Sequence, residues 1–218
     1  MAGISAELKQ EVARQDCFLC RPNAALLVNV GLVGYLMAGL GPLAGGYAVV
    51  ATHQHLRGLA EVDAEARRQY AEFAQRAALM LAKKYGGCFV VEHGNMAVCG
   101  IAEEGREHCF HPHFLLIPDA RCNTDAFLDY FGEDQRPFST LAEAINFGVE
   151  QGQYVLVGKA TGPFYVCIPK GELPRQFARA LIADQLGVEE LASWRDSPNP
   201  EWALSNAFEL RKLAVQHE

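Results

Sequence analysis

The sequence predicts an α+β protein, and two of its patterns carry that prediction. Short apolar runs, separated by turns that contain Gly and Pro, fill the stretch 24–52. They predict strands at 25–30, 33–38 and 46–52. The stretch 56–87 instead repeats apolar residues at spacings of three and four, among them Tyr70 and Leu81. This spacing predicts one long amphipathic helix and completes the mixed class.

Local signals place the other elements of the first half. A polar helix is predicted over 4–15, and Gly86 ends the long helix. The run CFVVEHG predicts a strand at 88–94, and a polar loop with glycines follows it. The next strand is predicted over 109–118, where the run CFHPHFLLIP turns wholly apolar.

After Pro118 the elements become shorter. Helices are predicted in NTDAFLDYF (123–131), in STLAEAINF (139–147), over 173–187 and over 201–215. YVLVGK and PFYVCIP predict a strand pair that turns at ATG. We therefore expect two parts: a catalytic or binding module at 1–120, and a C-terminal α+β extension at 121–218 that packs on it.

Composition and charge exclude several classes of partner. The chain has 218 residues, of which 50% are hydrophobic, so it can bury a sizeable core. Its net charge of −7 argues against nucleic acid or an anionic membrane as the main partner, because both require clustered Lys and Arg. A small phosphorylated ligand stays compatible with this charge, because it needs only a local site.

The uncharged stretch 24–51 is long enough to span a bilayer, yet six glycines, one proline and one asparagine divide it. Three strands explain it better than one spanning helix. The polar, helical residues 1–16 do not resemble a signal peptide. Seven irregularly spaced cysteines then indicate reduced thiols in a cytoplasmic protein.

The pair Cys17 and Cys20 forms a Cys-x-x-Cys motif that has three interpretations. It is half of a zinc site, a pair of buried thiols, or a redox pair, although a redox pair usually begins a helix in a βαβ unit. A zinc site needs two further ligands. The candidates near strand ends are His53, His55, His108 and His111.

His111 and His113 stand two residues apart on a predicted strand, so their side chains share a face with Cα atoms about 6.5–7 Å apart. One of them suits a metal or phosphate ligand and the other a nucleophile; two ordinary buried histidines are the alternative. Glu92, His93 and Asn95 end the preceding strand. If the two strands pair, both clusters share a rim; otherwise the second is a solvated turn.

These residues resemble the histidine triad (HIT) superfamily of nucleotide hydrolases and transferases. The family signature is His-x-His-x-His followed by apolar residues, and this chain has His111-Pro112-His113-Phe114-Leu115 before Leu-Ile-Pro. The His-Pro-His core is similar to the galactose-1-phosphate uridylyltransferase branch, which has glutamine at the third position. The stretch LGPLAGGYAVVATHQHLRGLAEV (40–62), the strand VVEHG and the cysteine pair extend the resemblance over residues 17–118.

The resemblance implies a HIT-like antiparallel sheet with one long crossing helix, and a zinc ion in its first part. The zinc ligands that it implies are Cys17, Cys20, His55 and His111. The middle histidine of the motif is the family's nucleophile, which corresponds to His113 here. It would attack the α-phosphorus of a nucleoside phosphate ester or anhydride and form a covalent nucleotidyl-histidine. Family members also form symmetric dimers by joining their sheets, which implies a homodimer unless the extension covers that edge.

Leu115 departs from both family patterns, because the third histidine normally donates to the phosphate. Losing one such donor costs roughly 10²–10³ in rate by the oxyanion-hole precedent. His108, near the position of a serine that contacts the leaving group in the family, is expected to compensate, with Arg106 adding charge. We expect Asn95, Arg106, His108 and Leu115 to contact the substrate, and His113 and His108 to be catalytic.

The leading expectation is therefore a nucleotidyl hydrolase or transferase acting on a nucleotide-type small molecule. Two other classes stay open. The first is a nucleotide-binding protein with weak or no catalysis, which Leu115 suggests. The second is a metal-stapled scaffold whose helical tail serves a partner.

Overall fold

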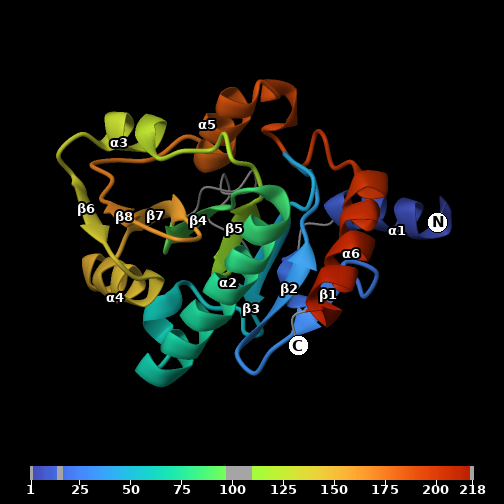
Figure 1. Ribbon diagram of the computed structural model, residues 1–218, viewed down its shortest axis with the longest axis horizontal. Helices are drawn as coiled ribbons and strands as arrows, with labels where there is room; N and C mark the ends of the chain where they lie inside the picture. Colours follow the sequence, from blue (N-terminus) through green and yellow to red (C-terminus); the bar gives the residue numbers. More distant parts are fainter. Residues whose placement is uncertain (1, 14–16, 97–109, 217–218) are drawn as a thin grey trace.

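A computed structural model describes residues 2–13, 17–96 and 110–216, and confirms an α+β fold (Figure 1). Its helices are α1 (Ala2–Ala13), α2 (Ala64–Tyr85), α3 (Asp125–Phe131), α4 (Leu141–Gln151), α5 (Phe177–Leu186) and α6 (Pro200–Val215). Its strands are β1 (Leu27–Val30), β2 (Gly34–Ala38), β3 (Ala48–Thr52), β4 (Phe89–Gly94), β5 (His113–Ile117), β6 (Gln135–Phe138), β7 (Tyr154–Lys159) and β8 (Phe164–Cys167).

The strands form one antiparallel sheet in the order β1-β2-β3-β5-β4-β7-β8-β6. β5 lies between β3 and β4, with His113 opposite Ala51 and Leu115 opposite both Val49 and Val91. β7 pairs along the whole of β4, from Phe89 opposite Lys159 to Gly94 opposite Tyr154. The sheet is therefore continuous across residue 120, and the second half of the chain contributes three of its strands.

The long helix α2 lies across the strands, as Figure 1 shows. It begins at Ala64 rather than at 56, because the Asp63 side chain accepts a hydrogen bond from the backbone N–H of Ala66 and caps the helix there. Gly86, with φ of 81°, ends it in the left-handed conformation. Tyr70 anchors the helix to the sheet by donating its hydroxyl to the carbonyl of Val50 at 2.8 Å.

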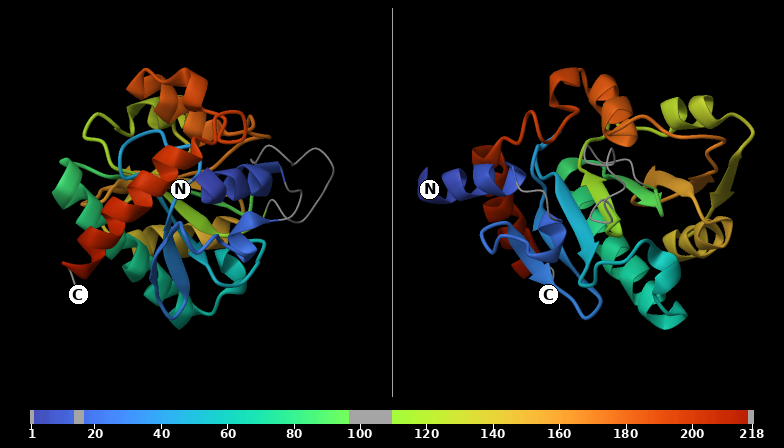
Figure 2. Two further views of the ribbon diagram at one scale, coloured as in Figure 1. Left: turned by 90° about the vertical axis from the view of Figure 1, so that its right-hand side faces the viewer. Right: turned by 180° about the vertical axis from the view of Figure 1, so that it is seen from behind.

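The remaining helices cover both faces and one edge of the sheet. α4 packs on β7 and β8 beside α2, while α6 packs on β1 and β2 and lies next to α1 (Figure 2). Arg211 of α6 donates to the carbonyl of Leu27 at 2.7 Å. Side chains alternate along a strand, so Phe89 points to the face of the sheet opposite α2. On that face its ring contacts Phe127 of α3. Phe127 in turn contacts Phe177 of α5.

Two strands differ from the prediction. β6 was not predicted, because its sequence QRPF includes Pro137; the strand lies at the sheet edge, where a missing N–H is tolerated. β5 begins at His113, four residues later than the predicted start at 109. In the described part of the chain no helix is both long and apolar enough to cross a membrane.

Candidate metal centre and active-site cleft

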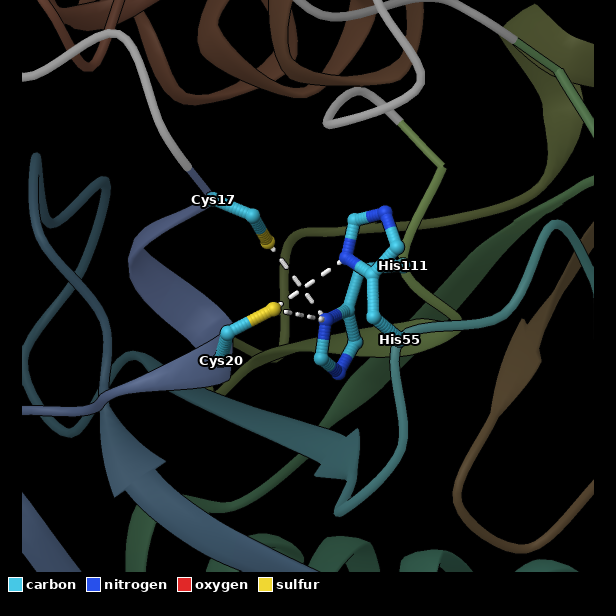
Figure 3. A group of neighbouring side chains, drawn as sticks. All are labelled: Cys17, Cys20, His55 and His111. Carbon is cyan, nitrogen blue, oxygen red and sulfur yellow. Dashed lines mark hydrogen bonds between the residues drawn. The ribbon is translucent and has the colours of Figure 1, made fainter.

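Two cysteines and two histidines from three separate stretches of chain converge on one point (Figure 3). Their ligand atoms all lie within 4.8 Å of one another; they belong to Cys17, Cys20, His55 and His111. The Cys20 thiol is 3.2 Å from Nδ1 of His55 and 3.7 Å from Nδ1 of His111. The four side chains point toward a common centre, so this cluster could hold a metal ion.

Local structure explains this convergence. Cys17 directly precedes the short 3₁₀ turn Phe18–Cys20, and Cys20 is its last residue. The hydroxyl of Tyr35 in β2 donates to the carbonyl of Leu19 inside that turn. His55 follows the end of β3, and His111 precedes β5, the strand that pairs with β3. The β3–β5 pairing therefore brings the two imidazoles together beside the turn.

The His111 ring is oriented by the backbone. Its Nε2–H donates to the carbonyl of Thr52 at 2.9 Å, which leaves Nδ1 without a proton and facing the two thiols. Metal-bound histidines usually donate their second nitrogen in this way. Burial also lowers the pKa of His111 to about 4, so the ring is neutral at pH 7 and free to act as a ligand.

The thiol of Cys17 needs a cation beside it to ionise. Burial, followed by the charge of neighbouring Cys20, raises the pKa of Cys17 to about 12. A bound ion would displace that proton, because thiolate is the form that coordinates metals. His53, another candidate ligand, points elsewhere and donates Nε2–H to the carbonyl of Gly31 at 2.8 Å.

A cleft opens beside this centre, and His113 lies in its wall. Nδ1–H of His113 donates to the carbonyl of His111 at 2.6 Å, so Nε2 carries the free lone pair of the ring. Burial lowers the pKa of His113, which favours the neutral ring. A neutral imidazole with a fixed tautomer is the form that a nucleophilic or basic histidine requires.

Comparisons with known proteins do not assign this site. No protein-family model matches the chain, and no curated protein matches it. The chemistry of the cleft must therefore be argued from its residues.

The cleft has an apolar floor next to its histidines. Leu115 lies two residues after His113 on β5, is 6% exposed and lines the cleft. Val49, directly opposite Leu115 on β3, continues this floor. Histidine triad proteins carry a hydrogen-bond donor at the position that corresponds to Leu115. In this chain that position therefore presents an aliphatic side chain to the cleft.

His93 is a residue whose importance the sequence only suggested. It lies on β4 one residue beyond the Glu92–Phe114 pair, so it stands beside His113 on the cleft face. Its Nε2 is inaccessible to solvent and has no hydrogen-bond partner within the described part of the chain. Burial, and then the charge of His113, lower the pKa of His93 to about 3. A buried nitrogen that makes no such bond calls for a partner, and a ligand in the cleft could supply it.

The other two residues of the predicted cluster at the end of β4, Glu92 and Asn95, point in different directions. Glu92 is 1% exposed, and its carboxylate lies near Tyr70 and Tyr154, so it is not part of a solvated turn. Burial raises the pKa of Glu92 to about 8. Asn95 does line the cleft, as expected, and has a left-handed φ of 49° where β4 ends. Alternation along β4 explains the division, since neighbouring side chains point to opposite faces.

Two predicted site residues, Arg106 and His108, lie outside the described residues. A cation that the prediction did not include, Arg57, lines the cleft, with its guanidinium 5.0 Å from the ring centroid of Phe110. Three more unpredicted residues reach the cleft from the second half of the chain: Gln176, Arg179 and Trp194. No local sequence signal could have identified these three, because only the tertiary fold brings them to the cleft.

Proposed function

We propose that this protein is a nucleotidyl hydrolase or transferase that acts through a covalent nucleotidyl-histidine at His113. One observation carries the proposal: the backbone carbonyl of His111 holds the proton on Nδ1 of His113, which leaves Nε2 as the nucleophilic atom in the cleft. The resemblance of residues 17–118 to histidine triad proteins supports the same role.

In the proposed reaction, the Nε2 lone pair attacks the α-phosphorus of a nucleoside phosphate ester or anhydride. A P–N bond forms, the bond from phosphorus to the leaving oxygen breaks, and the leaving group departs with that electron pair. Water or another acceptor hydroxyl then attacks phosphorus, the P–N bond breaks with its electron pair returning to Nε2, and the proton of the attacking hydroxyl passes to solvent. Throughout, the Nδ1–H of His113 stays hydrogen-bonded to the His111 carbonyl, which stabilises the positive charge of the imidazole ring in the intermediate.

Negative charge on the phosphoryl oxygens needs donors, and two described residues are suited to provide them. Nε2 of His93 is buried and has no partner among the described residues, and in the tautomer with Nε2–H it would donate to a phosphoryl oxygen. Arg57, which also lines the cleft, would contribute a positive charge. We propose that His93 donates the hydrogen bond to the phosphate that the third histidine of the triad motif would donate, because Leu115 at that position has no polar group.

We further propose zinc as the ion of the metal centre. Bond lengths of about 2.3 Å to sulfur and 2.0–2.1 Å to nitrogen give S···N edges of roughly 3.6 Å in a tetrahedron. The S···N separations of 3.4, 3.2 and 3.7 Å agree with that size. Four protein ligands leave no open position, so the ion would be structural and would hold the Phe18–Cys20 turn against β3 and β5.

The decisive experiment is to trap the intermediate. The full-length protein would be mixed briefly with adenosine and uridine 5′-phosphoramidates and dinucleotides, quenched, and analysed by peptide mass spectrometry. We expect a nucleotidyl adduct on His113 that is labile in acid and stable in base. His113→Ala should abolish adduct and turnover, His93→Ala should lower turnover by roughly 10²–10³, and His53→Ala, which changes a histidine outside the cleft, should leave both unchanged.

Turnover that persists in His113→Ala without any adduct would end the covalent proposal. A second function, nucleotide binding without catalysis, is favoured by the apolar Leu115 on the floor of the cleft. Nucleotide binding with no turnover in the wild-type protein would select it. In that case Leu115→Gln would be tested for restored turnover, because the uridylyltransferase branch has glutamine at this position.

A further inference from the structure

The second half of the chain forms one wall of the cleft that contains His113. Three residues of this wall line the cleft: Gln176 directly before α5, Arg179 within α5, and Trp194 in the loop before α6. The resemblance to histidine triad proteins is specific over residues 17–118 and assigns no role to the residues of this wall. Its chemistry differs from that of the histidine end, because it combines an aromatic ring, an amide and a buried cation.

Arg179 makes this wall rigid. The side chain is buried, and its Nη2 donates to the carbonyls of Gly41 at 2.7 Å and Leu191 at 2.8 Å. Its Nε donates to the carbonyl of Ala192 at 2.8 Å, and Nη1 donates to the hydroxyl of Tyr47 at 3.0 Å. These bonds fix α5 and the following loop against the turn between β2 and β3. Arg179 therefore acts as a positioning residue.

An aromatic corner stands next to this clamp. The rings of Trp194 and Phe18 lie 5.3 Å apart between centroids and are inclined by 43°, and both line the cleft. Phe18 belongs to the turn between the two cysteines of the metal centre. The guanidinium of Arg195 lies 4.7 Å from the Trp194 centroid. The metal centre and the C-terminal segment together hold this corner in place.

Gln176 is a polar residue in the lining of the cleft. Among the described residues its side-chain amide has no hydrogen-bond partner, so both its donor and its acceptor are open to a ligand. Its backbone has a φ of 56°, a left-handed conformation that is uncommon outside glycine and tends to occur at functional sites. The amide offers both a donor and an acceptor, which can read the edge of a planar heterocycle.

The two ends of the cleft are separated by the apolar floor. Ala51, opposite His113, is four residues from Tyr47, the partner of Arg179. This corresponds to about 13 Å along the strand, with Val49 and Leu115 between. A ligand whose phosphorus lies at His113 would thus extend over aliphatic side chains toward Trp194 and Gln176. A nucleoside 5′-phosphate has this order of parts: phosphate, sugar, planar base.

We propose that Trp194, Phe18 and Gln176 form a base-binding subsite, in which the two rings contact the flat face of a nucleobase and the Gln176 amide bonds its edge. The subsite rests on the proposed function only in assigning the phosphate to the His113 end. A base contact of this kind places substrate selection in the C-terminal segment, while the chemistry stays in the first part of the chain.

Equilibrium binding tests the subsite without requiring catalysis. Titration calorimetry would compare AMP, GMP, UMP and CMP with ribose 5-phosphate on the full-length protein. At least one nucleotide should bind about tenfold or more tightly than ribose 5-phosphate, in line with the usual strength of aromatic–base contacts. Trp194→Ala should remove that preference without changing the affinity for ribose 5-phosphate, and Gln176→Ala should narrow the differences among the four bases.

Matched variants control for general effects. Trp202→Ala changes an exposed tryptophan on α6, and Gln151→Ala an exposed glutamine at the end of α4; both should bind as the wild type does. Trp194→Phe should retain most of the preference, and Gln176→Ala carries the test if Trp194→Ala does not fold. Equal affinity for all five ligands, no binding at all, or unchanged binding in both Trp194 variants and Gln176→Ala would overturn the subsite.

The outcomes also separate the subsite from the proposed function. Base-dependent binding that Trp194→Ala abolishes, in a protein that turns over no nucleotide ester, would leave the subsite standing and reject the nucleophile. Turnover through His113 at equal rates for all bases, with no contribution from Trp194, would reject the subsite and leave the nucleophile.

Discussion

His113 and His111 show how a backbone carbonyl assigns a task to each imidazole. Thr52 holds the Nε2 proton of His111, so its Nδ1 faces the thiols. The His111 carbonyl holds the Nδ1 proton of His113, so its Nε2 is the nitrogen left without a proton. Two neighbouring histidines therefore expose opposite nitrogens, because each donates its single proton to a different carbonyl. This division requires both rings to be neutral, which burial favours by lowering the pKa of each.

Glu92 should make the stability of the protein depend on pH. Burial raises its pKa from 4.5 to about 8, and the titratable groups that interact with it are Tyr70 of α2 and Tyr154 of β7. Between these two values the unfolded chain has lost the proton while the folded chain keeps it. The contribution of Glu92 to the free energy of unfolding should therefore fall as pH rises from about 4.5 to about 8, with a slope on the order of 1.4 kcal/mol per pH unit. Below about pH 6.5 the buried His93 and His111, whose pKa values are lowered, contribute with the opposite sign, so the Glu92 slope is the difference between the wild type and a variant that lacks this carboxyl.

Glu92→Gln should abolish this slope, because the amide keeps the shape of the protonated acid without titrating. Denaturant melts at pH 5, 6.5 and 8 would measure it, with the variant gaining stability relative to the wild type as pH rises. Glu150→Gln, which changes an exposed residue of α4, serves as the matched control. A wild-type stability that rises over this pH range in step with the variant would contradict the assignment.

At the scale of elements, the short turn Phe18–Cys20 joins the metal centre to the aromatic corner. We expect one zinc ion per chain by elemental analysis of untagged protein. The double variant Cys17→Ser, Cys20→Ser should not bind the ion. If the free energy of unfolding falls by about 2 kcal/mol as a result, the melting temperature should fall by roughly 4–8 °C. His55→Ala should also weaken metal binding, whereas His53→Ala should not, because His53 bonds Gly31 instead.

The same coupling predicts a spectroscopic signal. In a Trp202→Phe background, Trp194 is the sole tryptophan, and its ring packs on Phe18. Removing the ion with a chelator should release the turn and shift Trp194 emission, and adding zinc should restore it. Zinc-free protein whose melting temperature and emission match those of the wild type would reject a structural metal.

At the scale of the whole molecule, the pairing of β4 with β7 joins the two halves of the sequence. β4 is apolar at Phe89, Val90 and Val91, and β7 covers its edge along six residue pairs. Without β7 that edge would expose unpaired backbone groups next to apolar side chains, which favours aggregation. The parts 1–120 and 121–218 therefore depend on each other for their pairing.

We expect a single cooperative unfolding transition. Far-UV circular dichroism and tryptophan fluorescence should give the same denaturant midpoint for the full chain. A fragment of residues 1–120 should be insoluble or lack a cooperative melt, because β4 loses its partner. Two separate transitions, or a fragment 1–120 that melts cooperatively on its own, would show instead that the first part is an independent domain.

The sequence by itself determined the local elements and the metal ligands. Helical and strand periodicity placed seven of the eight strands, because periodicity reports which face of an element is apolar. The Cys17–Cys20 pair indicated half of a metal site, and the resemblance to histidine triad proteins selected His55 and His111 as its partners, a set of four that the fold brings together. The periodicity and the cysteine pair are local signals, whereas the two histidines were chosen by the resemblance.

Only the tertiary structure decided what completes the cleft. Trp194 and Gln176 reach it because α5 and the loop after it fold back over the sheet, and Glu92 is buried because alternation turns it toward α2 while His93 faces His113. These contacts join residues far apart in the chain, and no local pattern encodes their partners. The strand order, set by the packing of the whole core, determines which side chains share the cleft.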